Sequence, residues 1–239
     1  TRFPYPPLFR SCYFSCFPQA IHFDTISPPK DAPWQLIAGM SQGPDGFLWL
    51  ADYTGVYKYD GRQFIHYFHD PKNSNSIADN RIECILADKS GIIWIGTYIN
   101  GLDRLNPATG IITHFRHIKK DTNSLSNDTI TALMQDKQGI IWIGTYGGLN
   151  RFDPQTNIFT HYSHIAGDPA SLSNDQVRAV YEDREGTIWV GTGSPFNENA
   201  EGGAGGLNRF DRKTGTFKSY LHNPEKPNSI SDNRVRAIF

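Results

Sequence analysis

The stretch DKQGIIWIGTYGGLNRFD, residues 136–153, identifies the fold because its core recurs along the chain. DKSGIIWIGTY occupies residues 88–98, DREGTIWVGTG occupies residues 183–193, and a weaker copy lies near the N-terminus. The tryptophans of the four copies are 45, 48 and 47 residues apart: Trp49, Trp94, Trp142 and Trp189. A period of this length, built from short strands and turns, is typical of a repeat architecture.

Each repeat contains four strand-like segments. In the third copy they are ITALM (130–134), IIWIGT (140–145), GLNRFD (148–153) and IFTHYSH (158–164). The first alternates apolar and polar residues, whereas the second is apolar on both faces and is expected to be covered on both sides. Between them lies a turn with an aspartate three residues before a glycine, which suits a tight turn with a positive φ. Four antiparallel strands in about 47 residues make one β-propeller blade.

The expected fold is therefore an all-β propeller that covers residues 21–239. Four complete blades are expected at about residues 34–74, 75–122, 123–169 and 170–227, and residues 228–239 begin a fifth with the strand VRAIF (235–239). Because the last unit starts and is not completed, we expect a piece of a larger ring. Closure with four blades is the alternative, since propellers have about four to eight blades.

The bulk composition excludes some functional classes. The chain has 239 residues, a net charge of −1 and a pI near 6.7, so it has no strong field to attract nucleic acid. No run of apolar residues approaches the roughly 18 that a membrane helix needs. We therefore expect neither nucleic-acid binding nor a membrane span in this segment.

Residues 1–20 do not follow the repeat. Arg2, Arg10, a short apolar stretch and Ala20 resemble the remnant of a cleaved signal peptide, but prolines interrupt the apolar part. Cys12 and Cys16 also lie here, and pairing between them stays open because one pair at this spacing is not diagnostic.

Catalytic machinery is not expected in this chain. Seven of the eight histidines recur at two positions of the repeat, so they point to different places around a ring instead of converging on a metal. There is no nucleophile elbow, phosphate-binding loop or paired-cysteine metal spacing. We expect no catalytic residue, no metal and no cofactor.

The best candidates for ligand contact follow the tryptophan strand. Tyr53, Tyr98 and Tyr146 share this position, and in the fourth copy Gly193 takes it at the start of an insertion of 11 residues. If these turns line one face, the tyrosines form an aromatic rim suited to sugars or other flat ligands. The alternative is that each tyrosine packs on its own hairpin. Within the insertion the candidate contacts are Phe196, Asn197 and Asn199.

The repeated stretch resembles a known family. ITALMQDKQGIIWIGTYGGLNRFDPQTNIFTHY (130–162) and DGFLWLADYTGVYKYDGRQFIHY (45–67) are similar to the repeats of two-component regulator propellers. In that family such blades form seven-bladed sensor rings outside the bacterial cytoplasmic membrane, followed by a β-sandwich, a membrane helix and an output such as a histidine kinase.

The resemblance implies a periplasmic sensor segment of a two-component receptor, tethered to the inner membrane through sequence beyond this chain. It also implies an oligosaccharide or other small ligand and a homodimer in the full-length receptor. Any kinase would lie outside this chain. A stand-alone propeller that binds carbohydrate or protein is the alternative, and a propeller lyase is less favoured because its histidine site is not periodic.

Overall fold

The structure is a computed structural model that describes residues 26–28, 34–194 and 205–239. Within these residues the chain forms β-strands and no helix, so the described part contains no helix that would span a membrane. The expectations for residues 1–20, including a pairing of Cys12 with Cys16, fall outside the described residues. The all-β prediction is confirmed.

The strands form four separate sheets, called blades one to four below, and the strand order in each follows the chain. Blade one contains β1 (Ile37–Gln42), β2 (Leu48–Asp52), β3 (Gly55–Tyr59) and β4 (Phe64–Tyr67). Blade two contains β5 (Ile82–Ala87), β6 (Ile93–Thr97), β7 (Leu102–Asn106) and β8 (Ile111–Phe115). Blade three contains β9 (Ile130–Gln135), β10 (Ile141–Thr145), β11 (Gly148–Asp153) and β12 (Ile158–Tyr162). Blade four contains β13 (Val177–Glu182), β14 (Ile188–Thr192), β15 (Gly206–Asp211) and β16 (Thr216–Tyr220).

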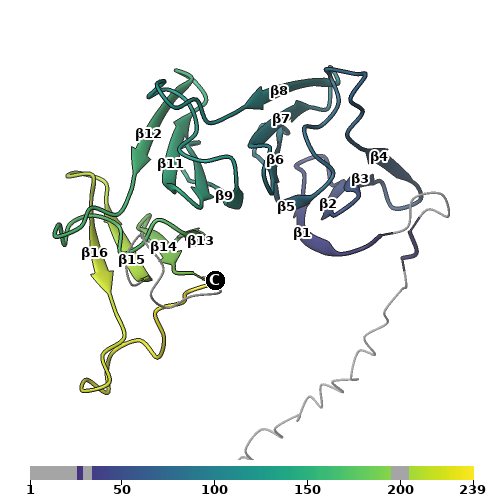
Figure 1. Cartoon of the computed structure of the whole chain (residues 1–239). Helices are drawn as coiled ribbons and strands as arrows, with labels where there is room; N and C mark the ends of the chain where they lie inside the picture. The colour runs from purple at the N-terminus through teal and green to yellow at the C-terminus, as the bar shows by residue number, and fades with distance from the viewer. Residues whose placement is uncertain (1–25, 29–33, 195–204) are drawn as a thin grey trace, which may run out of the picture.

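The blades are arranged as an arc with one open side (Figure 1). The first strand of each blade contacts the first strand of the next, from β1 through β5 and β9 to β13. The fourth strands lie on the outside of the arc. All neighbouring strands within a blade are antiparallel, as the sequence predicted. The number of blades in a complete ring stays a prediction.

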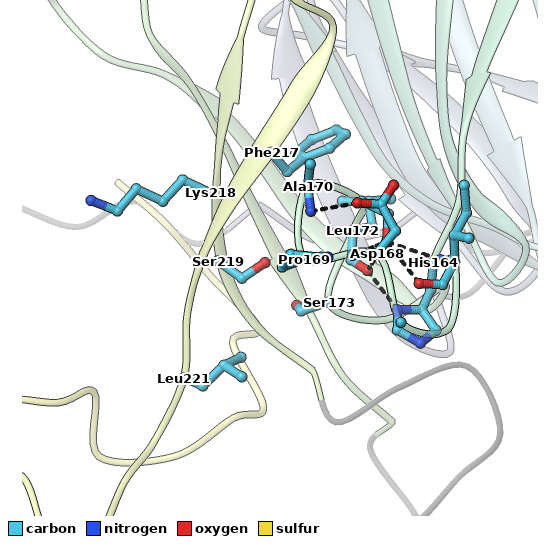
Figure 2. A pocket seen from close by; sticks show the side chains of 13 residues that line it. His164, Asp168, Pro169, Ala170, Leu172, Ser173, Phe217, Lys218, Ser219 and Leu221 are labelled. Carbon is cyan, nitrogen blue, oxygen red and sulfur yellow. Dashed lines mark hydrogen bonds between the residues drawn. The ribbon is translucent and has the colours of Figure 1, made fainter.

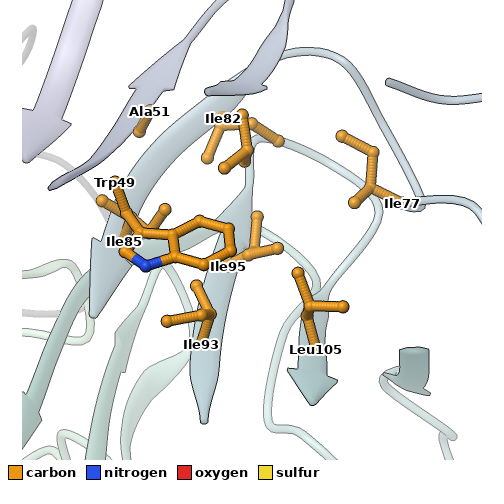
Figure 3. Packing of buried hydrophobic residues seen from close by; sticks show 9 residues of the cluster. Trp49, Ala51, Ile77, Ile82, Ile85, Ile93, Ile95 and Leu105 are labelled. Atoms are coloured by element: carbon orange, nitrogen blue, oxygen red, sulfur yellow. The ribbon is translucent and has the colours of Figure 1, made fainter. Parts of the chain in front are cut away.

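The apolar core lies between blades. Trp49 on β2 packs against Ile82, Ile93 and other residues of blade two (Figure 3). The same packing recurs at the next two interfaces. The ring centroids of Trp94 and Phe152 lie 5.6 Å apart, and those of Trp142 and Phe210 lie 5.2 Å apart. Each of these aromatic side chains removes a large apolar area from water, which supplies most of the driving force for stacking. The largest fully buried side chain at each of the three described blade interfaces is therefore a tryptophan, Trp49, Trp94 or Trp142.

In blades two to four, an aspartate in the preceding turn accepts a hydrogen bond from the tryptophan indole, which is buried in blades two and three and half-buried in blade four. Nε1 of Trp94, Trp142 and Trp189 donates to the Oδ2 atoms of Asp88, Asp136 and Asp183 at 2.9, 2.9 and 2.8 Å. The other carboxylate oxygen accepts main-chain N–H groups within the turn. A buried N–H without an acceptor would be costly, so this aspartate is structural.

Blade one departs from this arrangement. Gly43 occupies the aspartate position, because its N–H donates to Phe47 O just as that of Asp88 donates to Ile92 O. Trp49 is fully buried, and its Nε1 has no hydrogen-bond partner among the described residues. A Cβ atom on Gly43 would lie 3.7 Å from this nitrogen.

Glycines on the second strands let the next blade approach. A Cβ atom on Gly144 would lie 2.7 Å from Cγ1 of Val177, the first residue of β13, and one on Gly191 would lie 2.6 Å from the main-chain oxygen of Val235. Val235 thus lies against blade four as Val177 lies against blade three. Residues 235–239 nevertheless form no strand, because no second strand pairs with them in the described part of the chain.

We predict that Gly43→Asp stabilises the protein by about 1 kcal/mol relative to Gly43→Ala, because only aspartate supplies an acceptor for Nε1 of Trp49. The nearby Asp45 carboxylate must move aside, which its exposed position allows. Urea unfolding followed by tryptophan fluorescence measures the difference. Equal stability of the two variants would contradict this role of the missing acceptor.

A second prediction concerns the contact between blades three and four. Gly144→Ala should lower the free energy of unfolding by about 1–3 kcal/mol, because the added methyl group overpacks the space next to Val177. Val177→Ala restores space beside the added methyl group. The double variant should therefore lose less stability than the sum of the losses of the two single variants. The same urea titration applies, and strict additivity of the two changes would argue against direct contact.

Candidate functional site

The topology brings the candidate tyrosines to one face of the arc. In a four-stranded antiparallel blade, the turn from the second to the third strand lies at the same edge as the loop that enters the next blade. Tyr53, Tyr98 and Tyr146 follow the second strands β2, β6 and β10 directly. They therefore share a face with the residues that begin each first strand.

A small cleft of about 170 Å³ opens on this face. Tyr98 and Tyr146 both line it, whereas Tyr53 does not. The remaining lining residues come from the starts of the first strands of blades two, three and four: Arg81, Glu83, Thr129, Thr131 and Arg178. One cleft thus contacts three consecutive blades.

Arginine side chains contact all three tyrosine rings. The guanidinium carbon of Arg81 lies 3.6 Å from the ring centre of Tyr98 and 4.8 Å from that of Tyr53. Nη1 of Arg178 donates to the hydroxyl of Tyr146 at 3.1 Å. A cation over an aromatic face is attracted to the negative face of the ring. The tyrosines of blades one and three therefore contact the following blade, in addition to any packing on their own hairpins.

The electrostatic balance of the cleft is positive. Nε of Arg81 donates to Oε1 of Glu83 at 3.0 Å, and the hydroxyl of Tyr53 lies 3.4 Å from the same oxygen. Arg178 forms no ion pair within the described residues, so one positive charge of the cleft is not balanced. A guanidinium has five donors in a planar fork that matches a carboxylate or a sulfate. The cleft is chemically suited to a ligand with a ring and an acidic group.

Main-chain bonds hold Tyr98 and Tyr146 against the residues that precede β5 and β9. The N–H of Tyr98 donates to Arg81 O at 3.1 Å, and that of Tyr146 donates to Thr129 O at 3.2 Å. The three polar side chains Arg81, Glu83 and Arg178 were not among the candidates from sequence. The sequence does contain a signal for them. The residue type at each of their positions differs between the copies of the repeat, whereas the first residue of the strand, which neighbours each of them, is apolar in every copy.

Three segments, residues 76–98, 124–147 and 171–194, match the family model described as the two component regulator propeller. The chain contains two component regulator propeller repeats. Each matched segment runs from the loop before a blade, through its first strand, to the turn after its second strand. Tyr98 and Tyr146 thus fall within matched repeats, and the resemblance noted from the sequence is confirmed. No curated protein sequence matches the chain.

Solved structures share the fold. The extracellular domain of a putative one component system from B. thetaiotaomicron is 24% identical with a TM-score of 0.67, and the match covers 89% of this chain and 26% of that one. The extracellular domain of a putative hybrid two component system from the same organism is 22% identical with a TM-score of 0.54, and the match covers 85% of this chain and 37% of that one. A virginiamycin B lyase from Staphylococcus aureus is 16% identical with a TM-score of 0.54, and the match covers 81% of this chain and 57% of that one. This chain therefore spans well under two thirds of each of these structures.

The insertion in the fourth propeller repeat supplies no described contact. Phe196, Asn197 and Asn199 lie outside the described residues. The ends that flank them are close together, because a Cβ atom on Gly205 would lie 2.8 Å from Cα of Gly193. On either side of the insertion, β14 and β15 pair in the same register as β10 and β11 do in blade three.

The described histidines serve the repeat structure. At one repeated position, Nδ1 donates to the main-chain oxygen eight residues later at 2.6–2.8 Å, in His69, His117, His164 and His222. At the other, Nε2 donates to a main-chain oxygen in His66, His114 and His161. Within the described parts of the chain, no group of three or more His, Cys, Asp or Glu is placed to hold a metal ion.

His114 differs from the other histidines of the propeller repeats. Its Nδ1 lies 2.7 Å from Oδ1 of the buried Asp103, and its Nε2 lies 3.1 Å from Ser74 O. Both partners are acceptors, so the ring satisfies them together only when both nitrogens carry a proton. The hydrogen bond to Asp103 raises the pKa of His114 above its ordinary value of 6.5, against a smaller opposing effect of partial burial.

We predict that Asp103→Asn lowers the pKa of His114 toward 6.5, measured by NMR titration of the ring protons. Asparagine is a matched replacement, because Asn150 and Asn208 occupy this position in blades three and four. A raised folded-state pKa stabilises the fold fully below the unfolded value and loses this effect as pH rises through the folded value. The stability difference between wild type and variant should therefore shrink above pH 6.5, and a difference independent of pH would contradict the assignment.

Proposed function

We propose that this chain is a ligand-binding segment of an extracytoplasmic sensor in a bacterial two-component receptor. Its repeats belong to the two component regulator propeller, and two structures with the same fold are extracellular domains of signalling systems. The observation that carries the proposal is the cleft where Tyr98, Tyr146 and Arg178 meet from three blades. In this proposal the chain acts by binding, without catalysis.

The ligand we propose is an oligosaccharide with an acidic group. Pockets that enclose a whole small molecule measure about 300–1,000 Å³. A cleft of 170 Å³ therefore holds one sugar residue or one functional group of a longer ligand. The tyrosines provide amphipathic rings and hydroxyl groups, and Arg178 provides charge-assisted donors for a carboxylate or sulfate.

Signal transfer is proposed to follow from the position of the cleft. A ligand held by Arg81, Tyr146 and Arg178 contacts blades two, three and four at once. Binding that prefers one arrangement of these blades shifts the population toward it. In a full-length receptor, this change would reach an output such as a histidine kinase through a membrane tether and a homodimer.

A stand-alone binding propeller would use the same cleft, so only sequence beyond this chain separates it from a receptor. The likeness to a lyase concerns the fold alone, because identity is 16%. Each described histidine donates to a main-chain oxygen, which favours binding over histidine-dependent lyase chemistry.

The test is calorimetric titration with tetragalacturonate, which is acidic, and maltotetraose, which is neutral. Arg178→Gln should weaken tetragalacturonate binding about tenfold, the effect of one charge-assisted hydrogen bond. Tyr98→Ala with Tyr146→Ala should weaken it at least as much. Arg209→Gln is the matched control, because Arg209 is exposed on β15 and is not among the residues that line the cleft.

Equal binding of tetragalacturonate by wild type and Arg178→Gln, with the fold intact by circular dichroism, would rule out the cleft as the acidic-sugar site. Preferential binding of maltotetraose would instead contradict the proposed charge of the ligand.

A further inference from the structure

A second hollow, of about 820 Å³, lies at the outer rim between blades three and four. One wall is the outer strand β16 with the residue that follows it, and Phe217, Ser219 and Leu221 line this side (Figure 2). The other wall is the loop between the blades, residues 164–173. It shares no lining residue with the tyrosine cleft.

In the preceding blades a histidine of the chain itself occupies the corresponding position. His114 on β8 and His161 on β12 stand where blade four has Ser219. Nε2 of His114 lies 3.1 Å from Ser74 O, and Nε2 of His161 lies 2.6 Å from Ser124 O, both in the loop that enters the blade. Ser219 instead donates its hydroxyl to Oδ1 of Asn208, on the adjacent strand β15, at 2.8 Å.

The loop has lost a second side chain in blade four. In blades two and three an asparagine of this loop clamps the outer strand, since Oδ1 of Asn75 accepts from Ile112 N and Oδ1 of Asn123 accepts from Phe159 N. Ala170 takes this place in blade four, and its main-chain oxygen accepts from Phe217 N at 2.7 Å. The hollow therefore lies where blade four lacks both the histidine ring and the asparagine side chain that the preceding blades have.

The lining of the hollow is mostly apolar, and the charged residues Asp168 and Lys218 also line it. Ile165, Pro169, Ala170 and Leu172 face it from the loop. Nζ of Lys218 lies 5.4 Å from the ring of Tyr220 and points away in Figure 2. Asp168 accepts the N–H of Ala170, which keeps this carboxylate within its own loop. The loop oxygens that correspond to the histidine acceptors belong to Pro169 and Ser171, and no described residue donates to either.

We propose that this hollow is a binding site for a small, neutral, planar ring that carries one N–H or O–H donor, such as a heteroaromatic or phenolic compound. The ligand takes the place of the absent histidine ring, packs against Phe217 and Leu221, and donates to a loop oxygen. The volume lies within the range of about 300–1,000 Å³ for small-molecule sites. The site is independent of the proposed sensor function.

Indole is the probe, and 1-methylindole is the same ring without the donor. On the ¹⁵N-labelled chain, indole should shift the amide signals of Leu172, Ser219 and Leu221, with a dissociation constant on the order of 1 mM. 1-Methylindole should bind several-fold more weakly, because the loop oxygen is then left without its donor. Absence of indole-dependent shifts at these amides would overturn the proposal, and so would equal affinity for the two probes.

Ser219→His should weaken indole binding at least about tenfold, because the repeat shows that a histidine fits at this position. Ser219→Ala leaves the space open and should bind indole as the wild type does. Equal binding by the histidine and alanine variants, both folded, would place indole elsewhere and refute the site.

The reciprocal change keeps the test decisive if Ser219→His does not fold. His161→Ser combined with Asn123→Ala gives blade three the two small residues of blade four. It should create a second indole site, seen as new shifts at Phe159 and Leu125 that the wild type lacks. A folded double variant without these shifts would show that the two missing side chains do not make the site.

Discussion

Blade stacking depends on the packing of a tryptophan against the next blade, and in blades two and three a hydrogen bond from its indole N–H to a turn aspartate fixes the ring. Trp142 lies on β10, is fully buried and packs against Phe210 of the next blade, while Asp136 belongs to the turn of its own blade. The same carboxylate caps that turn, so one side chain couples the hairpin within a blade to stacking between blades. Apolar burial supplies most of the energy, and the bond orients the ring. In blade one the bond is missing, since no residue in the described part of the chain accepts from Nε1 of the buried Trp49.

Agreement between the copies marks what the stacking requires, and disagreement marks the candidate sites. The tryptophans, turn aspartates and repeated histidines are each explained by hydrogen bonds or packing within the propeller. Arg178 lies at a position that varies between the copies, Ser219 replaces a repeated histidine, and each lines a hollow. The physical reason is that every interface between blades must solve the same packing problem. Side chains are free to vary only where they face the inner edge or the outer rim.

The candidate tyrosines were found from sequence, but their partners were not. Their position after the second strand follows from strand order, which a local pattern reveals. The contact between Tyr146 and Arg178 joins residues 32 positions apart across two blades. It depends on how closely two sheets stack, which no local pattern contains. The same limit applies to the hollow beside Ser219: the missing histidine is visible in the sequence, but the space that it leaves open is not.

The sequence by itself determined the repeat period, the strand order and the turns, because alternation, glycines and aspartates act within a few residues of one another. Only the tertiary structure decided the arginine contacts of the tyrosines and the hollow between blades three and four. These depend on the distance and angle between separate sheets, which are set by the sum of many weak contacts along each interface.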